Sequence, residues 1–198
     1  MVIKNDNYGE TMKVSEALRL ADTDGVWAFT PQTFSALCGG IGPDYLKVLI
    51  KRLCDRDVLR RAAKGVYVNP YARCLPEDVR LGLVPLLRPR EVSYVSLESR
   101  LSEEGIISQA STALTLMTTG GTHLFRTPWG DVDFVHTERP ATPAGGVVSR
   151  PGTDVPHATL ARAYDDLVRV ARNVGLVDMD RLAEALREDV DERATHKP

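Results

Sequence analysis

Hydrophobic positions in the first third of the chain predict three helices followed by a hairpin. The first helix covers residues 12–20, where apolar residues recur at the spacing of one helical face. The second helix has a complete set of start signals. Thr30 is placed to cap it, Pro31 occupies its first position, and Phe29 and Phe34 hold the two positions of a hydrophobic staple.

A third helix is predicted to begin at Gly42-Pro43 and to bury one apolar stripe. The stripe comprises Leu46, Leu49, Ile50 and Leu53. After this helix, Lys64-Gly65 lies between β-forming residues, a pattern typical of a tight hairpin. This order of elements is typical of a winged helix-turn-helix, in which the third helix enters the major groove of DNA and the hairpin wing contacts phosphates.

The remaining two thirds mix helical and strand-like patterns. Helices are expected at residues 76–87 and 96–100, with Ser96 capping the second and Gly105 lying beyond its end. Three short β-prone segments follow, and the turns between them predict an antiparallel three-stranded meander at about residues 113–136. A Gly- and Pro-rich linker is expected at 139–156 and two final helices at about 157–190, separated by Gly175.

These patterns together predict an α+β protein with two domains. Residues 1–75 form the winged helix-turn-helix, and residues 76–198 form a mixed domain with the meander and the C-terminal helices. A length of 198 residues suits two small domains, and a hydrophobic content of 43% is sufficient for packed cores.

Charge is unevenly distributed, and this changes the interpretation of the first domain. The whole chain has a net charge of −2, but seven basic and three acidic residues lie between Asp44 and Lys64. Any affinity for nucleic acid must therefore come from this segment. The predicted DNA-binding residues are Tyr45, Lys47, Lys51, Arg52, Arg56, Arg60, Arg61 and Lys64.

Composition also bears on metals, cofactors and location. The three cysteines are widely spaced and form no Cys-x-x-Cys pair, and the histidines lie far from them in the sequence, so no zinc site is expected. No motif indicates a cofactor. The N-terminus lacks an apolar signal region, and we expect a cytoplasmic protein with reduced thiols and no membrane association.

The stretch GGTHLFRTPWGDVDF, which begins at Gly120, resembles the start of a nucleotidyltransferase active site. There, two carboxylates such as Asp131 and Asp133 would bind a divalent metal. That fold needs a helix between the glycine pair and the carboxylates, whereas here nine residues including Pro128 separate them and alternate like a strand. We therefore expect the two aspartates to lie on the solvent-facing side of a hairpin and the protein not to be an enzyme.

Two blocks of sequence resemble a known family. The segments YVSLESRLSEEGII and ALTLMTTGGTHLFRTPWGDVDFVHT are similar to the AbiE-type (AbiEi) antitoxins of type IV toxin–antitoxin systems, and the resemblance extends from about Met12 to Leu186. It implies a winged helix that represses the protein's own operon and a C-terminal domain that counters a nucleotidyltransferase toxin. Members of this family commonly act without forming a stable complex with their toxin.

The resemblance implies two partners, operator DNA and the toxin, with the protein bound to DNA as a monomer or weak dimer. Two other functions remain open from the residues alone. One is a metal-dependent, nucleotidyltransferase-like enzyme that uses Asp131 and Asp133. The other is a plain transcription factor whose second domain senses a ligand.

Overall fold

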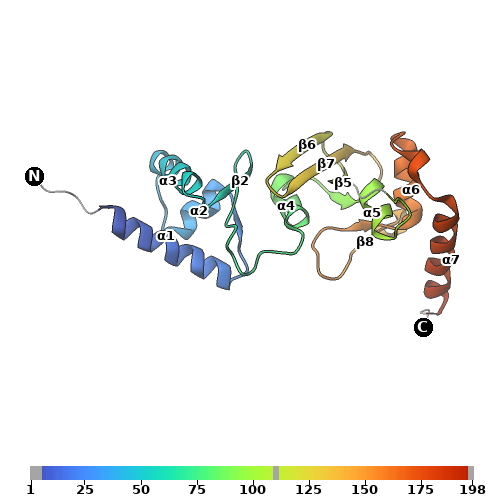
Figure 1. Cartoon of the computed structure of the whole chain (residues 1–198), viewed down its shortest axis with the longest axis horizontal. Helices are drawn as coiled ribbons and strands as arrows, with labels where there is room; N and C mark the ends of the chain where they lie inside the picture. Colours follow the sequence, from blue (N-terminus) through green and yellow to red (C-terminus); the bar gives the residue numbers. More distant parts are fainter. Residues whose placement is uncertain (1–5, 109–111, 196–198) are drawn as a thin grey trace, which may run out of the picture. The chain divides into compact units, whose positions relative to one another are not determined.

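The structure is a computed structural model that describes residues 6–108 and 112–195. It is of the α+β class, and the chain divides into two compact units, Met1–Val79 and Arg80–Pro198 (Figure 1). The predicted boundary, after residue 75, lies four residues earlier in the chain. Within the described ranges, no helix has both the length and the apolar character needed to cross a membrane.

The first unit contains three helices and a small sheet. In chain order its elements are α1 (Asp6–Thr23), β1 (Ala28–Phe29), α2 (Pro31–Leu37), α3 (Pro43–Asp55), β2 (Arg60–Ala63) and β3 (Val66–Val68). The sheet is antiparallel with the order β1-β3-β2, so β3 pairs on both sides. Strand β1, directly before α2, is therefore an edge strand of the same sheet as the hairpin.

The start of α2 confirms the predicted helix signals. The Thr30 hydroxyl accepts a hydrogen bond from the backbone N–H of Thr33, whose own hydroxyl accepts one from the N–H of Thr30. Phe29 and Phe34 are both buried and meet edge to face, with 5.6 Å between ring centroids. Gly65, at the tip of the hairpin, has φ +79°, a backbone conformation that favours glycine.

The second unit is built on a six-stranded sheet. Its elements are α4 (Val79–Leu87), β4 (Ser93–Val95), α5 (Leu97–Glu103), β5 (Ala113–Thr118), β6 (His123–Thr127), β7 (Gly130–His136), the 3₁₀ turn η1 (Pro143–Gly145), β8 (Val147–Val148), β9 (His157–Ala158), α6 (Leu160–Arg169), the 3₁₀ turn η2 (Val174–Leu176) and α7 (Met179–Thr195). The strand order is β6-β7-β5-β4-β9-β8. One hydrophobic cluster joins the sheet to α5, α6 and α7.

The predicted antiparallel meander is wrong in its pairing. The three strands lie where the sequence indicates, but β7 enters between β5 and β6 and pairs parallel to β5, with Leu116 opposite Phe134. The reason is burial. Val132 and Phe134 of β7 are fully buried and need neighbours on both sides, whereas Leu124 of β6 is 40% exposed and suits an edge.

The predicted linker at residues 139–156 is also wrong. This segment contains η1 and β8, and Val147 and Val155 are buried, so it is part of the folded sheet. The next predicted helix starts late as well, because His157 pairs with Val95 in β9 and Thr159 caps α6. The few buried apolar residues of the segment are scattered among glycines and prolines, and such a pattern resembles a loop.

Candidate nucleic-acid interface

The basic residues of α3 lie on its exposed side. Leu46, Leu49, Ile50 and Leu53 are buried, as the apolar stripe predicts, while Lys47, Lys51 and Arg52 are exposed. Tyr45 is in the first turn of the helix and is 37% exposed. The N-terminal half of α3 therefore presents a mixed aromatic and cationic surface.

Two of the cationic residues predicted to bind DNA form ion pairs with carboxylates of the protein itself. The Lys51 ammonium lies 2.6 Å from Asp55, and the Arg60 guanidinium contacts both carboxylate oxygens of Asp57 at 2.8 and 3.0 Å. Hydrogen bonds from Arg60 and from the Tyr71 hydroxyl lower the pKa of Asp57 to about 2. The charge of Arg60 is therefore less available to an anion from outside the protein.

The other predicted cations keep their charge available. Among the residues that the structure describes, Lys47, Arg52, Arg56 and Lys64 form no ion pair with a carboxylate, and Arg61 donates its Nε–H to the Ala63 carbonyl at 3.2 Å. Uncompensated cations at an exposed surface can neutralise phosphates without first breaking a bond within the protein.

A groove brings three of these residues together. It has a volume of about 760 Å³ and is bounded by α2, α3 and the hairpin (elements labelled in Figure 1). Lys47 and Lys51 reach it from α3, and Arg61 reaches it from β2. The structure therefore brings two cations of α3 and one of β2 to the same groove.

Arg56 belongs to a different groove of the same unit. That groove, of about 650 Å³, is also lined by Arg19 of α1 and by Arg73, with Tyr71 and Asp57 at its side. Arg19 and Arg73 were not predicted, because they lie in other elements and far along the sequence from the basic segment. No local pattern could have found them.

The carboxylates of the nucleotidyltransferase-like stretch are placed differently from expectation in one respect. Asp133 does not face water, because its carboxylate lies 2.7 Å from the Arg172 guanidinium and its side chain is only 17% exposed. Strand β6 occupies the segment between the glycine pair and Asp131, so no helix lies there, as predicted. Among the side chains that the structure describes, those of residues 14–108 and 112–188, no group of three or more His, Cys, Asp or Glu could hold a metal ion.

The second unit contains a buried polar cluster around Asp166. This fully buried carboxylate accepts hydrogen bonds from Tyr94, Ser96, Arg139 and Arg162 at 2.8 to 3.2 Å. Ser96 stands at the start of α5 as predicted, but its hydroxyl turns to Asp166 and does not cap the helix. Burial and the nearby Asp166 charge raise the pKa of Tyr94 to about 12, so its hydroxyl stays protonated.

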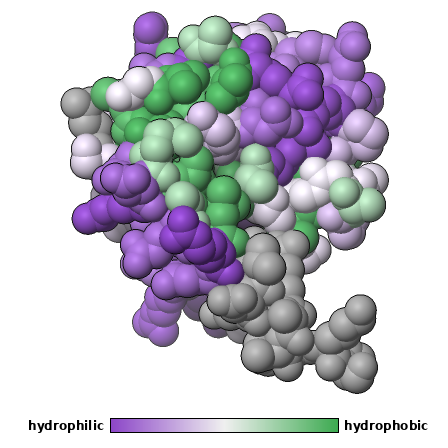
Figure 2. Space-filling view, turned by 90° about the vertical axis from the view of Figure 1, so that its right-hand side faces the viewer, coloured by the Kyte–Doolittle hydropathy of each residue, from purple (hydrophilic) through white to green (hydrophobic). Residues whose placement is uncertain are grey.

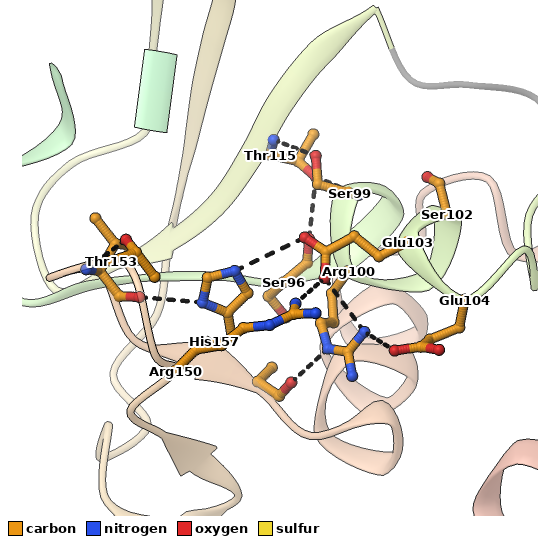
Figure 3. A network of polar contacts seen from close by, with 12 residues as sticks. Ser96, Ser99, Arg100, Ser102, Glu103, Glu104, Thr115, Arg150, Thr153 and His157 are labelled. Atoms are coloured by element: carbon orange, nitrogen blue, oxygen red, sulfur yellow. Dashed lines mark hydrogen bonds and ion pairs between the residues drawn. The ribbon is translucent and has the colours of Figure 1, made fainter. Parts of the chain in front are cut away.

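A second polar network lies around Arg100 and His157 (Figure 3). Arg100 contacts Glu103 and Glu104 at 3.3 and 2.8 Å, and Arg150 also contacts Glu103. His157 is buried, with Nδ1 3.0 Å from the Val155 carbonyl and Nε2 3.7 Å from Glu103. Each arginine in this network faces a carboxylate, so the cluster ties α5 to β9 and the segment before it.

Comparison with known proteins gives a result for the fold only. No family model matches this chain, and no curated protein sequence is similar to it. A solved structure does match, the crystal structure of the RV2827C protein from Mycobacterium tuberculosis, with a TM-score of 0.59 and 13% sequence identity. The match covers 89% of this chain and 71% of that one. The likeness is one of fold.

Proposed function

We propose that this protein is a DNA-binding antitoxin that represses its own operon and counters a nucleotidyltransferase toxin. The observation that carries the DNA-binding half is the arrangement of Lys47, Lys51 and Arg61 around one groove, with Lys64 at the tip of the adjacent hairpin. A cationic surface in a chain of net charge −2 favours a polyanion as partner.

The order of elements supports a winged helix-turn-helix. Helix α3 follows α2 after a short turn, and the β2–β3 hairpin follows α3. In this module the N-terminal part of the third helix meets base edges and the hairpin meets phosphates. Tyr45 and Lys47 are therefore the proposed base-contacting residues. Arg52, Arg61 and Lys64 are the proposed phosphate ligands, joined by Lys51, Arg56 and Arg60 with smaller contributions.

The antitoxin half of the proposal is supported by sequence resemblance and by an exposed apolar surface. Within the two similar segments, residues 96–99 lie at the start of α5 and residues 127–130 form the β6–β7 turn. The face of this unit that carries α6 and α7 has a hydrophobic patch (Figure 2). The exposed large apolar residues of α6, η2 and the start of α7 are 36% to 53% exposed, and they are Val168, Val174, Leu176 and Met179. Such a patch is suited to a protein partner.

Titration with operator and scrambled DNA duplexes at several salt concentrations tests the DNA-binding half. If roughly five phosphates are neutralised by each bound copy, log Kd should depend on log salt with a slope of magnitude about 4 to 5. The Arg61→Ala/Lys64→Ala variant should weaken binding to both duplexes alike and lower that magnitude by about two. An unchanged slope with intact operator binding would show that the DNA surface lies elsewhere.

Toxin neutralisation is tested separately, with the toxin expressed from a foreign promoter so that repression cannot protect the cells. The full chain carrying Arg61→Ala/Lys64→Ala should still protect, because these residues belong to the first unit. A Leu176→Asp/Met179→Asp variant should repress normally and lose protection. If protection is lost in the variant that loses DNA binding and kept in the variant that retains it, the second unit has no separate antitoxin role.

A further inference from the structure

The groove between α2, α3 and the hairpin has an apolar floor. Leu46 and Ile50 form its base, and the half-buried side chains of Ile41, Cys54 and Tyr67 line its walls. Its volume of about 760 Å³ lies within the range of small-molecule sites. A DNA backbone is polar and charged, so it would leave this apolar floor without a matching partner.

The rim of the groove is positively charged. Lys47 and Arg61 have no carboxylate partner among the described residues, and Lys51 shares its charge with the exposed Asp55. Asp55 is not among the lining residues, and none of the lining residues is acidic. An apolar floor below a cationic rim is complementary to a molecule with a hydrocarbon chain and one anionic group.

We propose that this groove binds an amphipathic anion, an aliphatic carboxylate, with the chain on Leu46, Ile50 and Tyr67 and the carboxylate at Lys47, Lys51 and Arg61. Because the same three cations belong to the proposed DNA surface, the bound anion lowers the affinity for DNA. This regulatory consequence rests on the proposed function, whereas binding of the anion does not.

Binding is tested by calorimetric titration of the full chain with decanoate at concentrations where decanoate is monomeric. Decanoate should bind saturably and about tenfold or more tightly than two probes that each lack one feature. Decyltrimethylammonium has the same chain with the opposite charge, and acetate has the same head group without the chain. Equal binding of decanoate and decyltrimethylammonium would overturn the proposal, and so would failure of decanoate to bind.

A groove-filling variant locates the site. Gln32 is exposed on α2 and lines the groove, so Gln32→Trp should block it and weaken decanoate binding by about tenfold or more. Ala36 is exposed on the same helix but does not line the groove, which makes Ala36→Trp the matched control. If both variants bind decanoate like the unaltered chain, the ligand lies elsewhere and the proposal fails.

The regulatory consequence is read from DNA binding in the presence of decanoate. Decanoate should weaken operator binding by the unaltered chain and by Ala36→Trp, but not by Gln32→Trp. If the unaltered chain binds decanoate at the groove but does not bind operator DNA when decanoate is absent, the proposed function is wrong and the anion site remains supported. If operator binding is normal and unaffected by saturating decanoate, the competition is wrong.

Discussion

The two units of this protein treat polar side chains in opposite ways. Among the described residues of the first unit, every buried side chain is hydrophobic, and the cations of α3 and the hairpin remain at the surface. In the second unit, nine of the described residues are polar or charged and buried: Ser93, Ser96, Glu98, Thr115, Thr118, Thr137, His157, Arg162 and Asp166.

This difference separates charge that is available for binding from charge that is used for folding. An exposed ion pair contributes little to stability, so the cations of the first unit can exchange a carboxylate or water for phosphate at small cost. A buried carboxylate with four partners is different, because removing one member leaves the others desolvated and unpaired. Charge substitutions should therefore affect binding in the first unit and stability in the second.

The largest effect is expected at Asp166. Replacing it with Asn removes the negative charge between Arg139 and Arg162, and the second unit should lose about 3–5 kcal/mol of unfolding free energy. The neighbouring Asp165→Asn is the control. It removes a half-exposed carboxylate that also pairs with Arg139, and it should cost no more than about 1 kcal/mol.

The chain has two tryptophans, Trp27 in the first unit and Trp129 in the second, so each unit can be followed in denaturant by its own fluorescence. Single-tryptophan backgrounds, made with Trp27→Phe or Trp129→Phe, assign each transition. The Asp166→Asn loss should be seen with Trp129 and not with Trp27. Equal losses for Asp165→Asn and Asp166→Asn would show that the buried cluster has no special role in stability.

The same contrast explains how much could be predicted from the sequence. In the first unit the decisive signals are local. Thr30, Pro31 and Phe34 mark the start of α2 within five positions, and Gly65 marks the hairpin. In the second unit the decisive contacts are distant. Tyr94 and Asp166 meet across 72 positions, and no spacing rule connects them.

The prediction of strand pairing is wrong for the same reason, because the deciding contacts are distant in the sequence. The sequence locates β5, β6 and β7, but a turn such as residues 128–129 specifies only the β6–β7 hairpin. The parallel pairing of β5 with β7 depends on which strands have buried side chains, such as Leu116 in β5 and Phe134 in β7, and distant parts of the chain decide that burial. At the candidate interface, the sequence identifies the cations correctly as basic and exposed, yet it does not show that Asp57 engages Arg60 or that Arg19 and Arg73 join Arg56.

A smaller effect, on DNA binding and not on stability, is expected at Lys47. Lys47→Ala should reduce discrimination between operator and scrambled DNA by about 1–3 kcal/mol if Lys47 makes a good base contact. The unfolding free energy of the first unit should change by no more than about 0.5 kcal/mol, because the side chain is exposed. Lys64→Ala, on the hairpin, is the control, since it should weaken binding to both duplexes equally. If Lys47→Ala lowers stability without lowering discrimination, the charge of Lys47 serves folding and not DNA binding.

Asp133 lies between exposed charge that is available for binding and buried charge that is used for folding, because its ion pair is partly buried. Asp133→Asn removes the contact with Arg172 and should cost the second unit about 1 kcal/mol, whereas Asp131→Asn should stay within about 0.5 kcal/mol. We expect neither variant to change any nucleotide-transfer activity, because we expect the unaltered chain to have none. Metal-dependent transfer by the unaltered chain that disappears in the double variant would establish the enzymatic alternative.

The smallest effect concerns pH. Burial lowers the pKa of His157, although the nearby Glu103 opposes this shift. The unfolded chain, with a histidine pKa of about 6.5, then takes up a proton that the folded unit resists. The contribution of neutral His157 to the unfolding free energy is therefore complete above about pH 6.5 and decreases as the pH falls toward the folded pKa.

In the first unit, Asp57 has a folded pKa of about 2, so its contribution decreases only when the pH falls below its ordinary value of about 3.9. Between about pH 6.5 and 4, the unfolding free energy of the second unit, followed by Trp129 fluorescence, should decrease. The His157→Gln variant should show a smaller decrease because glutamine does not titrate. Unfolding followed by Trp27 should be unaffected by this substitution. If the Trp129 transition has the same pH dependence in the unaltered chain and in the His157→Gln variant, the acid sensitivity of the second unit arises from other groups, and the desolvated histidine is not its cause.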